Sequence, residues 1–169
     1  MIGREGAAVF AMRLVLYEPD IPQNAGTMMR LAACLGVAVE LIEPCGFVFS
    51  DRHLRRAGMD YLEHVTLTRH SSFSRFEAWR HDQAPGARLL LLTTKGEVAY
   101  QNFVYDFDDL IMVGRESAGV PDAVHASADA RLRITLVPGL RSLNVAAAAA
   151  MVLGEALRQT GMLPPRAGR

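Results

Sequence analysis

Three short segments of the chain carry residue types that can bind or act on a small ligand. They span residues 24–30, 114–121 and 138–144, and together they hold glycines, asparagines, arginines, two serines and a glutamate. Glycine allows a ligand to approach the backbone closely, and arginine can bind a phosphate or a carboxylate through two parallel hydrogen bonds. The three segments therefore predict a ligand site assembled from parts that lie far apart in the chain.

In the first segment, the spacing predicts how Arg30 is presented. Asn24 is expected to cap a helix whose approach is stiffened by Pro22. Residues 26, 27 and 30 then share the side of the helix opposite an apolar stripe that includes Met28 and Leu31. Arg30 is therefore predicted to point away from the core, beyond a glycine that lets a ligand come close. A solvated arginine beside a helix cap is the plainer interpretation, and it stays open on these residues alone.

The second and third segments each follow an apolar run that is typical of a strand. Gly114 comes directly after such a run, where a bare backbone can turn sharply or contact a ligand, and Glu116 lies two residues beyond it. In the third segment, Ser142 or Asn144 can cap the helix that follows. The free N–H groups at the start of that helix favour a carboxylate or a phosphate. The plainer interpretations are an ordinary turn and a capped core helix.

A fourth feature is a cluster of arginines at 52, 55 and 56. Arg52, Arg55 and Arg56 fall on one predicted helical face, which suits either the binding of nucleic-acid phosphates or, more commonly for a run of charges, contact with solvent. The sequence has no G-x-x-x-x-G-K-[ST] phosphate loop, no G-x-G-x-x-G dinucleotide fingerprint and no G-x-S-x-G nucleophile turn. These absences argue against the commonest nucleotide-binding and hydrolase sites.

The elements that must position these segments alternate between strands and helices. The uninterrupted leucine run Leu89–Leu92 is typical of a central strand that is covered on both faces. The alternation predicts an α/β fold with a mainly parallel sheet flanked by helices, and ligands bind at the carboxyl edge of such sheets. Strands are predicted at residues 14–17, 37–42, 65–67, 89–92, 110–113 and 132–136, and helices at 24–35, 73–81 and 143–160.

Length and composition fit one globular domain. The chain has 169 residues, 50% of them hydrophobic, and a formal net charge of zero, which argues against a generally basic nucleic-acid binder. We assign residues 12–163 to a single domain, 1–11 to a flexible extension and 164–169 to a tail. Cys34 is expected to be buried, and the absence of ligand spacings argues against a metal site. No apolar run is long enough to span a membrane, and a reducing cytoplasm is the expected location.

Taken in order, the motifs of these segments resemble those of the SPOUT methyltransferases, specifically the branch that methylates ribose 2′-hydroxyl groups. The resemblance covers residues 12–161. It depends on Asn24-x-Gly26-x-x-x-Arg30, Gly114-Arg115-Glu116-x-x-Gly119-x-Pro121 and Arg141-Ser142-Leu143-Asn144-Val145. Within the family, residues 16–24, 54–61 and 92–96 look like those of small members that methylate the wobble ribose, cytidine or uridine 34, of tRNA.

The resemblance implies a C-terminal trefoil knot, S-adenosylmethionine as the cofactor, tRNA as the substrate and a homodimer. Arg30 is the implied catalytic residue, acting either as the base or as a charged phosphate anchor. Methylation of another tRNA or rRNA ribose, and a non-catalytic RNA-binding protein with this fold, are the alternatives. The implied cofactor pocket comprises Leu92, Thr93, Gly114, Ile134, Leu136, Ser142 and Leu143, and Asn24, Glu116, Ser142 and Asn144 are expected to orient the substrate or the loops.

Overall fold

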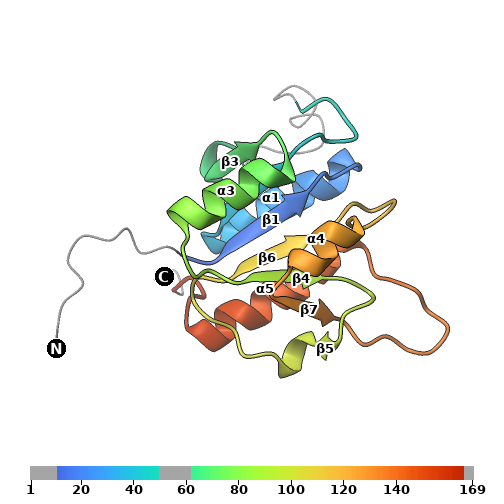
Figure 1. Cartoon of the computed structure of the whole chain (residues 1–169). Coiled ribbons are helices and arrows are strands. Elements are labelled where there is room, and N and C mark those ends of the chain that lie inside the picture. The colour runs from blue at the N-terminus through green and yellow to red at the C-terminus, as the bar shows by residue number, and fades with distance from the viewer. Residues whose placement is uncertain (1–10, 50–61, 166–169) are drawn as a thin grey trace.

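The computed structural model describes residues 11–49 and 62–165 (Figure 1). These residues form one sheet of seven strands in the order β3-β2-β1-β6-β4-β7-β5, and every neighbouring pair is parallel. The predicted α/β fold with a parallel sheet is confirmed, whereas the knot stays a prediction. The strands are β1 (Arg13–Tyr17), β2 (Ala38–Ile42), β3 (Leu67–His70), β4 (Leu89–Leu92), β5 (Val98–Ala99), β6 (Leu110–Val113) and β7 (Ala130–Arg133).

Helices cover both faces of this sheet. Successive side chains of each strand point to opposite faces, so apolar residues are buried on both sides. Leu14 and Leu16 pack in the cluster beneath α1 (Pro22–Leu35) and α5 (Val145–Thr160), and these two helices also contact each other. Alternate residues face the other cluster, beneath α3 (Phe73–Gln83) and α4 (Asp122–Ser127). The leucine run follows the same rule, because its second residue packs in the first cluster and its first and third in the other.

Helix α1 differs from its prediction in two ways. It begins at Pro22, whose fixed φ and missing N–H suit the first turn, so the N-cap is Ile21 and makes no side-chain hydrogen bond. The prediction that Asn24 caps the helix is therefore wrong. Cys34 is exposed rather than buried, because it lies four residues after Arg30 on the outer face of the helix. The predicted stop at Gly36 is confirmed by its left-handed conformation, with φ of 68°.

Strand pairing and capping correct three further boundaries. Strand β3 begins at Leu67 instead of residue 65, because Leu67 pairs with the second residue of β2. Strand β7 begins at residue 130 and ends at Arg133, so residues 134–136 leave the sheet. Helix α5 begins at Val145 instead of 143, because the Asn144 side chain accepts hydrogen bonds from the backbone of Ala146 and Ala147.

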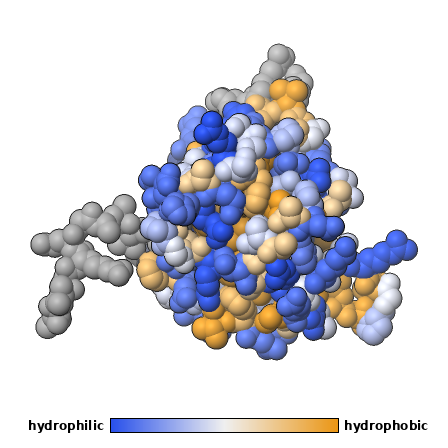
Figure 2. Space-filling view, in the orientation of Figure 1, coloured by the Kyte–Doolittle hydropathy of each residue, from blue (hydrophilic) through white to orange (hydrophobic). Residues whose placement is uncertain are grey.

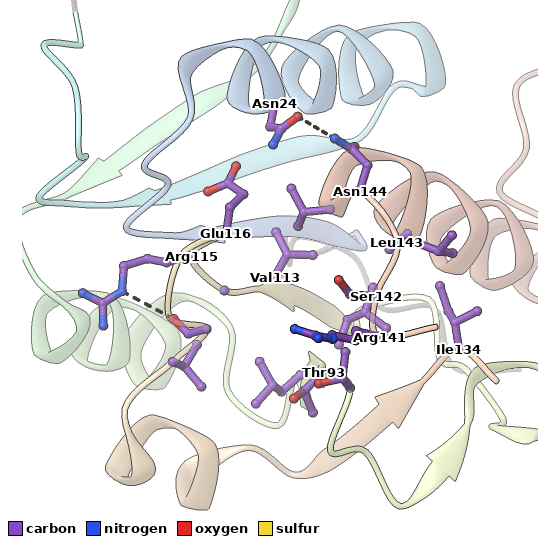
Figure 3. A pocket seen from close by; sticks show the side chains of 18 of the residues that line it. Asn24, Thr93, Val113, Arg115, Glu116, Ile134, Arg141, Ser142, Leu143 and Asn144 are labelled. Atoms are coloured by element: carbon purple, nitrogen blue, oxygen red, sulfur yellow. Dashed lines mark hydrogen bonds between the residues drawn. The ribbon is translucent and has the colours of Figure 1, made fainter. Parts of the chain in front are cut away.

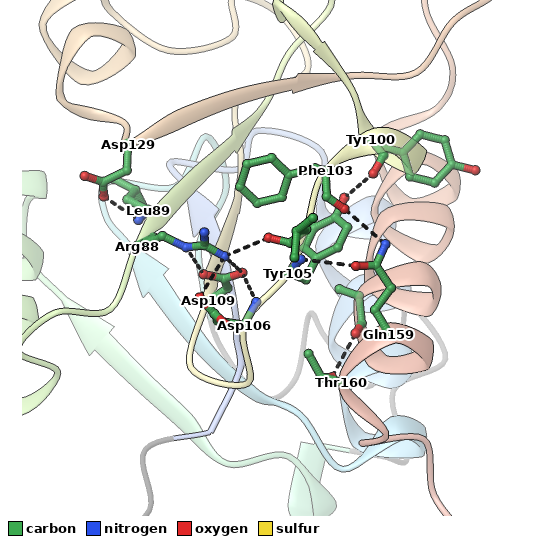
Figure 4. Close-up of polar contacts among 12 residues, drawn as sticks. Arg88, Leu89, Tyr100, Phe103, Tyr105, Asp106, Asp109, Asp129, Gln159 and Thr160 are labelled. Atoms are coloured by element: carbon green, nitrogen blue, oxygen red, sulfur yellow. Dashed lines mark hydrogen bonds and ion pairs between the residues drawn. The ribbon is translucent and has the colours of Figure 1, made fainter.

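A polar network at the amino edge of the sheet fixes the far end of α5 (Figure 4). Arg88 donates two hydrogen bonds of 2.8 Å to the buried carboxylate of Asp109. Gln159 of α5 accepts from the Tyr105 N–H at 3.2 Å and donates to the Phe103 carbonyl at 3.1 Å. Helix α5 is therefore held to the segment before β6, and its amino end is directed at the opposite edge of the sheet.

The visible surface in Figure 2 intersperses apolar side chains among larger hydrophilic areas. None of the helices in the described ranges combines the length and hydrophobicity required to cross a membrane. Among the same residues, no cluster of three or more His, Cys, Asp or Glu side chains is placed to hold a metal ion.

Candidate functional site

A cavity of about 640 Å³ lies where the strands of the C-terminal half end (Figure 3). Leu92 ends β4 and Val113 ends β6, and both line the cavity, as does Ile134 immediately beyond β7. The position agrees with the rule that open parallel sheets bind ligands outside the carboxyl ends of their strands. A small-molecule site usually has a volume of about 300–1,000 Å³, so the cavity is of a suitable size for a cofactor.

The cavity collects the residues of all three motif segments. The seven residues proposed for the cofactor pocket all line it: Leu92, Thr93, Gly114, Ile134, Leu136, Ser142 and Leu143. The four residues expected to orient the substrate or the loops also line it: Asn24, Glu116, Ser142 and Asn144. Arg30 is exposed on α1 and does not belong to the cavity lining, and Gly26 is buried, so the two do not share an outward side as predicted.

Several lining residues had no role in the sequence interpretation. Arg141 was quoted within a motif, and Figure 3 shows its side chain reaching into the cavity near Thr93 and Ser142. A guanidinium in this position can bind a carboxylate or a phosphate. Apolar lining residues such as Ile21 and Val120 carry no chemical signal of their own, and only the fold places them here.

Asn24 and Asn144 join the first helix to the last. The Asn144 amide nitrogen donates to the Asn24 carbonyl oxygen at 2.9 Å, although 120 positions separate the two residues. The Asn144 oxygen accepts from two backbone N–H groups of α5, so the same side chain also caps that helix. The pair fixes the amino end of α5 against α1, at the rim of the cavity (Figure 3).

Glu116 also lies at the rim of the cavity, where it contacts Asp20. The Asp20 backbone N–H donates to Glu116 Oε2 at 3.2 Å, and the two carboxyl groups share a hydrogen bond. Burial, followed by that hydrogen bond, raises the pKa of Glu116, whereas hydrogen bonding from Asn24 lowers it in part. The same contact lowers the pKa of Asp20 to about 2. At this rim the negative charge therefore stays on Asp20, and Glu116 takes up a proton first.

The close packing of the 114–120 loop explains why glycine stands at position 114. A Cβ at Gly114 would lie 2.9 Å from the carbonyl carbon of Gly119 and 3.0 Å from a methyl group of Val120. On the sequence alone, a side chain at 114 would either fill ligand space or obstruct a sharp turn of the backbone. Because the obstructing atoms belong to the 114–120 loop itself, a valine at 114 would instead push this loop away from its position on the cavity wall.

Backbone groups of the third segment are available to a ligand. Among the described residues, the loop 134–144 makes one internal backbone hydrogen bond, from the Leu140 N–H to the Val137 carbonyl. Unpaired amides beside apolar side chains can hydrogen-bond the edge of a heteroaromatic ring while its faces pack on those side chains. The amino end of α5 also opens on the cavity, through Val145 and Ala148.

The proposed RNA-binding arginines cannot be placed. Arg52, Arg55 and Arg56 lie outside the described residues.

Comparison with known proteins identifies the family. The profile of the SpoU rRNA Methylase family matches residues 11–154. A protein of Beijerinckia indica subsp. indica, named tRNA (cytidine(34)-2'-O)-methyltransferase, is 64% identical over 150 residues, which are 89% of this chain and 92% of the relative. A protein of the same name from Escherichia coli K12 is 41% identical over 152 residues, which are 89% of this chain and 94% of the relative.

Solved structures agree with this assignment. One that concerns the 2-OH methylation of C/U34 on tRNA superimposes with a TM-score of 0.80 at 42% identity, covering 88% of this chain and 95% of that one. An AdoMet-bound rRNA methyltransferase from Sinorhizobium meliloti gives a TM-score of 0.78 at 27% identity, and the match covers 88% of this chain and 56% of that longer one. The chain belongs to the SpoU rRNA methylase family.

Proposed function

We propose that this protein transfers a methyl group from S-adenosylmethionine to the ribose 2′-hydroxyl of the wobble nucleotide, cytidine or uridine 34, of tRNA. The observation that carries the proposal is the assembly of the three motif segments around one cavity in a chain that is 64% identical to a relative named for this reaction. The alternative of a non-catalytic binding protein is disfavoured, because Asn24, Glu116, Ser142 and Asn144 all line that cavity.

The cavity fits S-adenosylmethionine. Leu92, Ile134 and Leu136 provide apolar walls for an adenosine ring, and the unpaired amides of the 134–144 loop provide partners for its edge. Arg141 and the amino end of α5 suit the carboxylate of the methionine part. When bound, this cofactor supplies an electrophilic methyl group on a sulfonium.

The chain must align the 2′-hydroxyl, assist the loss of its proton and exclude water. Asn24, Asn144 and Glu116 hold the rim in a fixed arrangement, and Ser142 lines the cavity as an exposed residue. Arg30 either anchors the substrate phosphate as a cation and stabilises the developing alkoxide, or accepts the proton once desolvated.

The experiment that tests the function combines purified protein, total tRNA and labelled S-adenosylmethionine, followed by nucleoside mass spectrometry. We expect 2′-O-methylcytidine or 2′-O-methyluridine, with the label at position 34 when the digested fragments are mapped. Label at another tRNA position or on ribosomal RNA would move the assignment to another ribose. Bound cofactor without product on any RNA would favour the binding-protein alternative.

We also propose a homodimer in which Arg30, and the arginines at 52, 55 and 56, serve the cavity of the partner subunit. Arg30 is six residues beyond Asn24, about 9 Å along the helix axis, and is not part of the lining of its own cavity. Helices α1 and α5 contact each other, and the outer side of α5 exposes Ala147 and Met151, of which Met151 is 40% accessible. An exposed apolar face of this kind suits a subunit contact.

The expected result for assembly is a dimeric mass in light scattering of the active protein. Met151→Glu would place a charge on the proposed contact, so it should shift the mass towards the monomer. Methyl transfer should fall with the dimer. A fully active monomer would contradict the proposed assembly.

A further inference from the structure

The Asp20 side chain accepts three hydrogen bonds at the rim, although it is not part of the cavity lining. Its Oδ1 accepts the Glu116 N–H at 3.1 Å, and its Oδ2 accepts the Ser117 N–H at 3.3 Å together with the Ser117 hydroxyl. Its own N–H donates to the Glu116 side chain. One carboxylate therefore binds two consecutive amides of a loop that follows it by about a hundred residues.

The loop bound by Asp20 forms one wall of the cavity. Arg115 and Gly119 exchange two backbone hydrogen bonds, of 2.9 and 3.1 Å, which close residues 115–119 into a tight turn. Arg115, Glu116 and Gly119 all line the cavity. The internal bonds set the shape of the turn, and Asp20 fixes where that turn lies relative to α1.

Asp20 is in turn held from its other side by a glycine. A Cβ at Gly46 would lie 2.7 Å from Asp20 Cβ and 2.9 Å from Asp20 Cα, and the Gly46 N–H donates to the Pro19 carbonyl at 3.0 Å. The segment after β2 therefore packs directly on Asp20. No side chain fits at Gly46 unless Asp20 moves.

We propose that Asp20 is a positioning residue that holds the 115–119 turn against the cofactor cavity, and we call its contacts with Glu116 and Ser117 the Asp20 clasp. Asp20 does not line the cavity and would not contact the reacting atoms, so its effect on the ligand is exerted through the position of the turn. The inference deepens the proposed function, because it takes S-adenosylmethionine as the ligand of that cavity. The clasp itself exists in the ligand-free chain and can be tested there.

The clasp also determines which carboxyl group carries charge. A shared hydrogen bond lowers the pKa of Asp20 to about 2 and adds to the burial that raises the pKa of Glu116. The other charged groups around this turn are Arg115, which pairs with Glu18 at 3.3 Å, and Arg141 across the cavity. Removing the Asp20 charge should therefore lower the pKa of Glu116, which a purely steric role would not do.

The first test measures amide hydrogen exchange in ligand-free protein and S-adenosylhomocysteine binding by calorimetry. Asp20→Ala should raise exchange at residues 116 and 117 and weaken binding by about tenfold, because charge-assisted hydrogen bonds are lost. Asp82→Ala is the control, since Asp82 is 70% exposed on α3 and remote from the cavity. Unchanged exchange and affinity in Asp20→Ala would overturn the proposal. Absence of binding by the wild-type protein would instead refute the proposed cofactor and leave the exchange test standing.

Two further variants separate position from charge. Gly46→Ala leaves the carboxylate in place but must displace Asp20, so it should raise exchange at the same two amides. Asp20→Asn removes the charge while keeping one acceptor, and a carbon-13 carboxyl titration should then give a lower pKa for Glu116 than in the wild type. An unchanged Glu116 pKa in Asp20→Asn, or unchanged exchange in Gly46→Ala, would contradict the clasp.

Discussion

Replacing Arg30 by alanine should lower the rate of methyl transfer by between about 10²- and 10⁴-fold, the contribution typical of a positioned acid–base or charge-stabilising group. The side chain is exposed and not part of the cavity lining. The unfolding temperature and the affinity for S-adenosylhomocysteine should therefore stay close to those of the wild type. Single-turnover kinetics with tRNA, together with calorimetry, measure the rate and the affinity separately.

Arg30→Lys distinguishes the two roles left open for this residue. Lysine keeps the charge but loses the planar fork that binds two phosphate oxygens. If Arg30 anchors phosphate, lysine should be nearly as poor as alanine at every pH. If proton removal limits the rate, the lysine variant should recover activity as the pH rises, because an amine titrates within reach and a guanidinium does not.

The matched control is Arg75→Ala, which removes an exposed helical arginine from α3, on the other face of the sheet. Its methyl transfer should remain close to that of the wild type. Near-normal turnover of Arg30→Ala would place the active residue elsewhere. Mixing two inactive variants adds a test of the assembly. If Arg30 acts on the partner's cavity, mixed dimers of Arg30→Ala and a cavity variant should regain activity, because one of their two sites then combines an intact cavity with an intact Arg30.

The sequence was most informative where one residue property decides the structure. The leucine run at 89–92 was typical of a strand covered on both faces, and the structure confirms the strand and buries three of its residues almost completely. Gly36 and Gly161 marked two helix ends, and both adopt left-handed conformations, with φ of 68° and 70°. These predictions succeeded because the cause lies within a few neighbouring residues.

The predictions failed where distant residues decide. Asn24 looked like a helix cap, but its partner is Asn144, which local spacing cannot reveal. Ile134 and Leu136 extended an apolar run, yet β7 ends at Arg133, which pairs with the last residue of β5, and both residues line the cavity instead. The role of Asp20 could not be predicted from its neighbours in the sequence, because its carboxylate accepts hydrogen bonds from the amides of residues 116 and 117.

Gly96 is another residue whose identity is decided by a distant part of the chain, the backbone of β7. We expect Gly96→Ala to lower the stability of the protein and to weaken cofactor binding. A Cβ at Gly96 would lie 2.5 Å from the Leu132 carbonyl oxygen and 2.7 Å from the Arg133 nitrogen. These are backbone atoms of β7, so the turn that carries Gly96 must move instead. That turn begins at Thr93, whose carbonyl accepts the Gly96 N–H at 3.1 Å, and Thr93 lines the cavity.

Overpacking of this kind costs about 1–3 kcal/mol, and a domain of this size loses about 2–4 °C of unfolding temperature per kcal/mol. Calorimetric scanning should therefore show Gly96→Ala melting several degrees below the wild type, with weaker S-adenosylhomocysteine binding. Gly154→Ala is the control: it adds the same methyl group within α5, where no atom of the subunit other than the neighbouring backbone of that helix lies within 4 Å of the new Cβ. Because alanine favours a helix interior over glycine by about 0.8–1.0 kcal/mol, this variant should melt at or above the wild-type temperature and bind normally. Equal behaviour of the two variants would show that the approach of Gly96 to β7 does not position the Thr93 wall of the cavity.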